Sequence, residues 1–396
     1  MIKRLESEHT ARLFYLDAIR AVSIIAIIFL HVSSPMVQDF AAYRLSWWWI
    51  ANVVYSFARP SIALFVMISG LLLLSPAKEE SISRFFRKRF FRIVVPFLAW
   101  GTVYFFWKTH GIISCSSIIQ LMKEFIIGPV YYHLWFIYTI AGIYLAVPVF
   151  RVYVKHASRS NQAYLLTLWF IGTALYPLIR HFTGFSIGIP ILVAGGFLGA
   201  FLLGNFLRDY QTGKRAAIYL ILVMLASLIF TAFSTYYLSM RNNAQYDGTF
   251  EDFLSPNVIA AAVCLFLLLR DFSFEGLKNP AASCEGSSIP MEEKYTYSHS
   301  LTPEQAPGNP LVVGFRRKFS VVYNLITMIS SASFSIYLMH ILVLEILKGH
   351  LPGFSLEACT FHPLVGIPLT AGVTLALCMM VVISMRKIPL MKYIFP

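Results

Sequence analysis

Charged residues are scarce in this chain. Asp, Glu, Lys and Arg together make up 13% of its 396 residues, about half their share in a typical soluble domain. Hydrophobic residues make up 58%, and the mean hydropathy is +0.68. This composition excludes an ordinary soluble globular protein. Apolar runs of about 20 residues, the length that crosses a bilayer, recur along the whole sequence and predict an all-α polytopic membrane protein.

Cysteine is also sparse and scattered. The five cysteines form no Cys-x-x-Cys pair, and no histidine stands at metal-ligand spacing from them. The pattern indicates neither a disulfide framework nor a zinc site, and we expect no bound metal. The chain also lacks a P-loop, a dinucleotide fingerprint and the His-Glu-x-x-His and Gly-x-Ser-x-Gly motifs. The sequence therefore does not indicate nucleotide binding or hydrolysis through any of these motifs.

Ten apolar runs are candidate membrane spans, and we expect them to form a single membrane domain over residues 1–396. They lie at 13–34, 47–74, 90–108, 131–150, 162–183, 188–207, 216–239, 254–270, 326–347 and 364–385. Residues at about 271–318 are mostly polar and rich in Pro, Ser and Glu, which predicts a flexible cytoplasmic loop. We expect no appended soluble domain, so that any chemistry takes place in the helical bundle.

The basic residues, which give a net charge of +13, sort by side of the membrane. With the N-terminus inside, the cytoplasmic segments hold 24 of the 32 Lys and Arg residues and the opposite loops hold 6. The positive-inside rule predicts such an asymmetry, so a nucleic-acid partner is not needed to explain the charge. The even number of runs places both termini in the cytoplasm.

Three polar residues interrupt the first apolar run, YLDAIRAVSIIAIIFLHV at 15–32. A charge at the bilayer centre costs about 2.5–3.5 kcal/mol on insertion scales, so it needs a partner or a function. Asp17 and Arg20 are one helical turn apart and within pairing reach. Arg20 and His31 share a face, separated by about 16 Å along the axis. A structural ion pair plus a packed histidine is the plainer interpretation, but three such residues on one face favour a function.

Five basic residues crowd the segment RFFRKRFFR at 84–92, which we expect in the loop after the second span. Positive-inside topology explains part of this density. Arginines one helical turn apart, as Arg84 and Arg87 or Arg89 and Arg92, can also bind phosphates through both guanidinium nitrogens. On the motif alone the two interpretations are equally good.

Other features carry less information. His133, in YYHLWF, stands at the outer start of the fourth run, where an interfacial position explains it. His340 lies in the outer half of the ninth run. Gly195–Gly204, GGFLGAFLLG, has small residues at four-residue spacing, which is typical of helix packing rather than phosphate binding.

Four segments resemble, in order and spacing, the motifs of one family. Arg20 and His31 form its Arg-x10-His hallmark, and RPSIALFVMISGLLL at 59–73 resembles its second-span motif with Ser-Gly. RFFRIVVP at 89–96 resembles its basic segment before the third span, and SFSIYLMH at 333–340 its late motif ending in His. The chain thus resembles the acyltransferase-3 family of integral-membrane acyltransferases.

Residues 131–150, YYHLWFIYTIAGIYLAVPVF, are similar to the branch of this family that O-acetylates surface glycans. The resemblance is good over 13–150 and 320–385, whereas the middle spans agree by hydropathy alone. Ala63 stands where relatives often have Pro, with Pro60 nearby. This difference shifts a helix kink and leaves the chemical groups in place.

The resemblance implies a bundle of about ten spans that takes an acyl group, by expectation acetyl, from cytoplasmic acyl-CoA. The acceptor is a hydroxyl of a cell-surface or lipid-linked glycan. Acyl-CoA is then the donor co-substrate. The expected partners are membrane lipid, the glycan acceptor and separate polysaccharide-assembly proteins, and the expected location is the bacterial cytoplasmic (inner) membrane.

The resemblance also suggests roles for single residues. His31 would take the proton of the acceptor hydroxyl, or carry the acyl group itself, with Arg20 and Asp17 as the other catalytic residues. The residues expected to bind CoA are Arg20, Arg84, Arg87, Arg89 and Arg92. The candidate substrate-binding residues are Arg59, His133, Trp135 and His340.

A transporter or flippase of lipid-linked glycan is the alternative, because it too needs buried charges in a bundle. Against it, the sequence shows neither an inverted repeat of hydropathy nor paired broken helices. A membrane glycosyltransferase would need carboxylates in its outer loops, and residues 240–252 contain only Asp247, Glu251 and Asp252. Dependence on acyl-CoA separates the acyltransferase from both.

Overall fold

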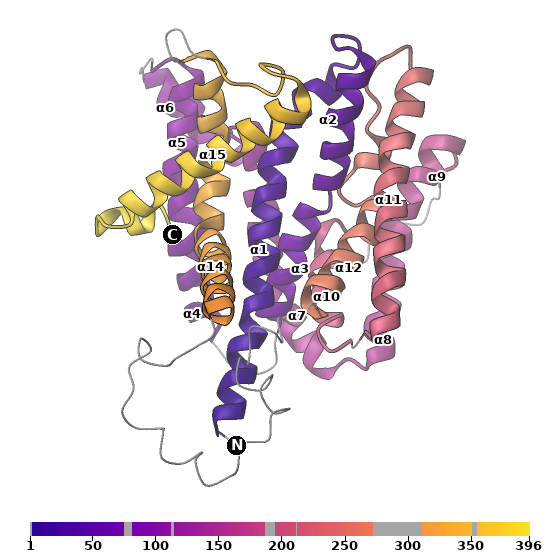
Figure 1. The fold of residues 1–396 in the computed structure, drawn as a ribbon, viewed down its shortest axis with the longest axis vertical. Coiled ribbons are helices and arrows are strands. Elements are labelled where there is room, and N and C mark those ends of the chain that lie inside the picture. The colour runs from indigo at the N-terminus through magenta and orange to yellow at the C-terminus, as the bar shows by residue number, and fades with distance from the viewer. Residues whose placement is uncertain are drawn as a thin grey trace.

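The computed structural model describes the backbone of residues 2–74, 81–111, 115–186, 195–210, 212–271, 310–350 and 355–396. Within these residues the chain is helical and has no strand (Figure 1). Nine helical segments of this part are long and apolar enough to cross a membrane. The chain is therefore a multi-pass membrane protein built as a helical bundle.

The helices follow one another as continuous spans or as pairs that share a span. They are α1 (Ile2–Gln38), α2 (Leu45–Ala58), α3 (Ser61–Leu73), α4 (Ile82–Arg89), α5 (Val95–Lys108), α6 (Cys115–Ile127), α7 (Trp135–His156), α8 (Arg159–Phe170), α9 (Tyr176–Thr183), α10 (Phe197–Phe206), α11 (Lys214–Arg241), α12 (Pro256–Asp271), α14 (Pro310–Glu345) and α15 (Pro363–Met385). Short helical turns lie at η1 (Phe90–Val94), η2 (Tyr132–Leu134), η3 (Ile171–Leu175), η4 (Thr249–Glu251), η6 (Ile346–His350) and η7 (Leu390–Tyr393). The loop expected at about 271–318 falls mostly outside the described residues.

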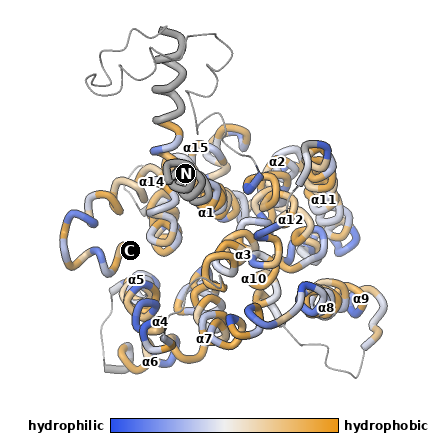
Figure 2. The backbone as a smooth tube through the Cα atoms, turned by 90° about the horizontal axis from the view of Figure 1, so that it is seen from below, coloured by the Kyte–Doolittle hydropathy of each residue, from blue (hydrophilic) through white to orange (hydrophobic). Residues whose placement is uncertain are grey.

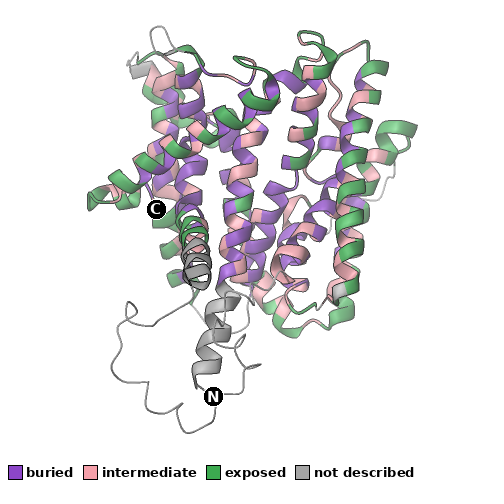
Figure 3. Ribbon diagram, in the orientation of Figure 1, coloured by how far each residue is buried: buried purple, intermediate pink, exposed green. Residues whose placement is uncertain are grey.

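Helix α1 runs through the middle of the bundle. Helices α14 and α15 lie on one side of it and α2 and α3 on the other (Figures 1 and 2). Buried residues concentrate on these central helices, whereas the outer helix α11 is largely exposed (Figure 3). We call the end of the bundle where α1 begins the proximal end, and the opposite end the distal end.

Of the span expected at 188–207, the structure describes residues 195–207. Its described part contains the ten-residue helix α10 and no longer helix. Ten residues rise about 15 Å, half the thickness of the hydrocarbon core. Nine spanning segments are therefore found in the described part of the chain, where the sequence predicted ten.

Small residues hold α10 against α3. A Cβ atom added at Gly204 would lie 1.9 Å from the Met67 carbonyl oxygen, and one added at Gly70 would lie 1.6 Å from that of Phe201. The two backbones therefore approach more closely than any larger side chain would allow. This is the helix packing that the sequence predicted for Gly195–Gly204.

The second span is broken into two helices. Helix α2 ends at Ala58 and α3 begins at Ser61, with Arg59 and Pro60 between them. Proline has no N–H to continue the ladder of α2. The break brings a charged side chain to the middle of the span.

The basic segment at 84–92 is helical, which corrects the expectation of a loop. Ser81 caps α4 by accepting a 3.4 Å hydrogen bond from the Arg84 amide, and the helix continues through the π-helical turn η1 into α5. Pro96 lies just after this π-helical turn, and its missing N–H interrupts the hydrogen-bond ladder of the continuous helix there. The arginines therefore point in fixed directions around a helix.

Candidate active site

The polar face of α1 begins at the proximal end with Asp17 and Arg20. Ser330 of α14 donates a 2.6 Å hydrogen bond to Asp17 Oδ1, and Arg20 Nη1 lies 3.7 Å from the same oxygen. The expected ion pair is thus present but long. The carboxylate is held mainly by Ser330, and about a third of the Arg20 side chain is exposed.

The basic segment divides into two groups. Arg92 and Tyr144 are electrostatic neighbours of Arg20. The Arg89 guanidinium lies 4.7 Å from the centre of the Phe85 ring and 5.9 Å from that of Tyr144. Arg20, Arg89 and Arg92 therefore surround one region of the proximal end, which we call the cationic group.

The other two arginines of the segment face elsewhere. Arg84 and Arg87 line an open hollow with Lys88, Phe91 and Tyr393. The sequence could not separate the two groups, because both have the same one-turn spacing. The structure brings only Arg89 and Arg92 near Arg20.

Three histidines from distant parts of the sequence meet near the distal end of the α1 face. The ring centroids of His31 and His340 are 5.1 Å apart, and those of His133 and His340 are 5.5 Å apart. Tyr132 lies edge-on to His31, at 5.7 Å between centroids. The sequence indicates all three histidines, but it predicts an interfacial position for His133, which the structure shows to be fully buried. No group of three or more His, Cys, Asp or Glu side chains among the described residues has metal-binding geometry.

A set of hydrogen bonds holds this histidine cluster (His31, His133 and His340) in place. Tyr104 donates to the Leu338 carbonyl oxygen over 2.9 Å and accepts from the Leu342 amide over 3.0 Å. The Tyr337 hydroxyl donates to the His133 carbonyl oxygen. These bonds tie α14 to α5 and η2, so that His340 and His133 have little freedom to move apart.

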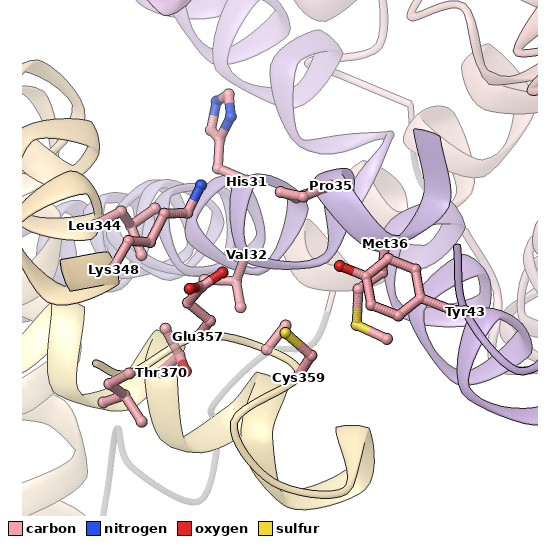
Figure 4. Close-up of a pocket in the computed structure, with 12 residues that line it drawn as sticks. His31, Val32, Pro35, Met36, Tyr43, Leu344, Lys348, Glu357, Cys359 and Thr370 are labelled. Carbon is pink, nitrogen blue, oxygen red and sulfur yellow. The ribbon is translucent and has the colours of Figure 1, made fainter. Parts of the chain in front are cut away.

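A small cavity borders His31 on the side of the loop between α14 and α15. It has room for about one water molecule, about 20 Å³. Polar side chains of its lining include Tyr43, Lys348 and Glu357, and the His31 ring points away from Glu357 (Figure 4). Burial raises the pKa of the Tyr43 phenol, and Cys359 and Glu357 raise it further, so this hydroxyl stays a neutral donor near pH 7. The cavity is too small for a sugar ring.

Arg59, at the break between α2 and α3, occupies an aromatic enclosure. Its guanidinium lies 4.6 Å from the centre of the Tyr55 ring and 4.4 Å from that of Phe253, at distances typical of cation–π contacts. Trp135 stacks on Phe253 with 5.7 Å between centroids. The positive charge of Arg59 also reaches the His31 ring, so that this enclosure adjoins the histidine cluster.

Glu251 was not among the residues selected from the sequence. It is fully buried, accepts a hydrogen bond from Tyr246 and interacts electrostatically with Arg59. In the sequence it was one of three carboxylates of a presumed outer loop. Only its burial beside a buried arginine distinguishes it, and nothing in a single sequence reports that.

Comparison with known families gives one match. The sequence model of a family described as "Acyltransferase domain" matches residues 13–284, from the start of the α1 span to beyond α12. The matched range includes Arg20, His31 and the basic segment, whereas His340 lies outside it. Comparison with curated proteins gives no match, and neither does comparison with solved structures. Since the match covers more than half of the chain, the protein belongs to the acyltransferase-3 family and is a membrane acyltransferase.

Proposed function

We propose that this protein is an O-acyltransferase of the bacterial cytoplasmic membrane. It takes an acetyl group from cytoplasmic acetyl-CoA and transfers it to a hydroxyl of a cell-surface or lipid-linked glycan. One observation carries the proposal. A single face of α1 has the cationic group at its proximal end and the histidine cluster near its distal end.

The cationic group suits the phosphates of CoA. Three guanidinium groups lie together there, and guanidinium binds phosphate through two parallel hydrogen bonds. Arg20 is only loosely paired with Asp17, which leaves N–H groups for a ligand. The pantetheine arm would then follow the α1 face for the rise of about 16 Å between Arg20 and His31.

His31 suits the chemical step. The neutral imidazole takes the proton of the acceptor hydroxyl while the hydroxyl oxygen attacks the thioester carbonyl carbon. The C–S bond breaks, and the departing thiolate recovers the proton from the imidazolium, giving free CoA and the O-acyl product. In the two-step variant His31 first accepts the acyl group itself and then passes it to the hydroxyl.

The enclosure around Arg59 suits the acceptor. Aromatic rings such as Phe253 and Trp135 offer apolar faces, and a guanidinium donates hydrogen bonds to hydroxyl or anionic oxygens. The cavity beside Tyr43 takes about one water or one hydroxyl. Arg59 and Trp135 are therefore our candidates for glycan recognition.

The test is turnover of radiolabelled acetyl-CoA by the purified full chain in phospholipid nanodiscs. We expect the wild type to bind and consume acetyl-CoA. A folded His31→Ala variant should bind it about as well and lose transfer by at least about 100-fold. The exposed His362 supplies the control, since His362→Ala should behave as wild type.

The opposite result is equally clear. If the wild type neither binds nor consumes acetyl-CoA, while a fluorescent lipid-linked glycan crosses the bilayer of proteoliposomes that contain it, the proposed transfer from acetyl-CoA is wrong. His31 and Arg20 would then belong to a transport path.

A further inference from the structure

His340 has one ring nitrogen anchored and the other unsatisfied. The side chain is fully buried, and its Nδ1 lies 2.7 Å from the Tyr337 carbonyl oxygen and 3.2 Å from that of Ile336. A carbonyl only accepts, so Nδ1 carries the hydrogen. In the neutral ring Nε2 then has a lone pair, and no described group donates a hydrogen bond to it. A buried acceptor without a donor is costly.

The nearest histidine ring is that of His31. A centroid separation of 5.1 Å leaves room for one hydrogen bond of about 3 Å between facing ring edges. His133 is the other histidine neighbour, at 5.5 Å and nearly perpendicular. Catalytic hydrogen bonds are often long without substrate and shorten in the complex.

The backbone around His340 is fixed from both sides. Tyr104 bonds to Leu338 on one side of His340 and to Leu342 on the other. The Nδ1 anchor then sets the orientation of the ring. Nε2 is therefore presented in a constant direction, as an orienting partner requires.

We infer that His340 is a positioning residue for His31, whose ring N–H it accepts at Nε2. This bond selects the His31 tautomer in which the other nitrogen is unprotonated and faces the reactants. When that nitrogen takes the proton of the acceptor hydroxyl, the bond to His340 stabilises the imidazolium, and His340 neither gains nor loses a proton. The inference rests on the proposed function, in which His31 reacts.

Two substitutions separate this role from a purely structural one. His340→Asn places an amide N–H near the position of Nδ1, so that the bond to Tyr337 is kept and the Nε2 acceptor is lost. His340→Gln extends its amide to the position of Nε2 and keeps an acceptor there. We expect His340→Asn to lower kcat by at least about tenfold with the KM for acetyl-CoA unchanged, and His340→Gln to retain more activity. A structural role predicts the reverse order.

A second measurement does not depend on acyl transfer. Diethyl pyrocarbonate modifies unprotonated imidazole nitrogens, and mass spectrometry of peptides gives the rate for each histidine. We expect His31 to react several-fold more slowly in His340→Asn than in the wild type, while the exposed His362 reacts equally in both. Melting temperatures establish that each variant is folded.

The outcomes distinguish a failure of the His340 role from a failure of the proposed function. Normal kcat in folded His340→Asn, or an unchanged His31 modification rate, overturns the role of His340 and leaves the proposed function intact. No acetyl-CoA turnover by the wild type overturns the proposed function and with it the positioning role of His340. Loss of kcat together with slower modification of His31 supports both.

Discussion

Ser330 Oγ lies 2.6 Å from Asp17 Oδ1, whereas Arg20 Nη1 lies 3.7 Å from that oxygen. The carboxylate is thus fixed to α14 by a short hydrogen bond and holds the guanidinium only loosely. A tight bidentate pair would use the N–H groups of the arginine. The observed arrangement orients Arg20 and leaves those groups for a ligand.

Arg20→Ala should therefore weaken the binding of acetyl-CoA. A hydrogen bond to a charged group contributes about 1.5–3 kcal/mol, which corresponds to about 10–100-fold in Kd. Ser330→Ala should have a smaller effect, because Asp17 still faces Arg20. Titration calorimetry of the full chain in nanodiscs measures both.

Arg208 provides the control for that experiment. It is also a proximal arginine, but its guanidinium pairs with the adjacent Asp209 at 3.2 Å. Arg208→Ala should leave Kd unchanged. Equal losses for Arg20→Ala and Arg208→Ala would show that general positive charge, and no defined site, attracts CoA.

The two groups of the basic segment should differ in function. Arg89→Ala and Arg92→Ala should each raise the KM for acetyl-CoA about tenfold, by the loss of a charge-assisted bond to phosphate. Arg84→Ala and Arg87→Ala change charges of the open hollow, outside the cationic group, and salt screens such exposed charges, so their effects should be small and vanish at high ionic strength. Steady-state kinetics at low and high salt gives the comparison. Equal effects from all four arginine variants would contradict the separation of the basic segment into two groups.

Much of the fold follows from the sequence because spanning requires apolar runs of a set length. The shared face of Arg20 and His31 follows from helical geometry alone. The short helix α10 could not be predicted from hydropathy, since Phe197–Phe206 is as apolar as a true span. Its place depends on the close backbone contact at Gly204, which is a property of two helices together.

The candidate site was predicted only in part, for a similar reason. His31 and His340 were visible as polar residues in apolar runs, but their contact depends on how α1 and α14 pack. The sequence indicates Glu251 only as one of three loop carboxylates, because a carboxylate in a short loop is ordinary until its burial is known. Pairwise contacts between distant spans leave no trace in one sequence.

Gly204→Ala should destabilise the protein strongly. The new Cβ would meet the Met67 carbonyl oxygen at 1.9 Å, so the two backbones must separate, and overpacking of this kind costs about 1–3 kcal/mol or more. Gly142→Ala in α7 is the matched control, because nothing lies within 4 Å of its added Cβ. Thermal melting in detergent should show a lower midpoint for Gly204→Ala alone. A similar midpoint for both variants would mean that α10 does not pack tightly on α3.

Arg59 and Glu251 should prove energetically coupled. Both are buried, and Glu251 interacts electrostatically with Arg59. Breaking a direct buried pair costs about 3–5 kcal/mol, because the remaining charge is uncompensated; Arg59 and Glu251 interact electrostatically without a direct ion pair, so each single loss should cost less than this. Arg59→Met and Glu251→Gln should each lower the midpoint of denaturant unfolding, and the double variant should cost less than the sum of the two by about 1–3 kcal/mol. Strict additivity would show that the two residues act independently.

A folded double variant that still binds acetyl-CoA but transfers no acetyl group to the acceptor would further assign the enclosure around Arg59 to acceptor recognition, because the cationic group at the proximal end remains unchanged.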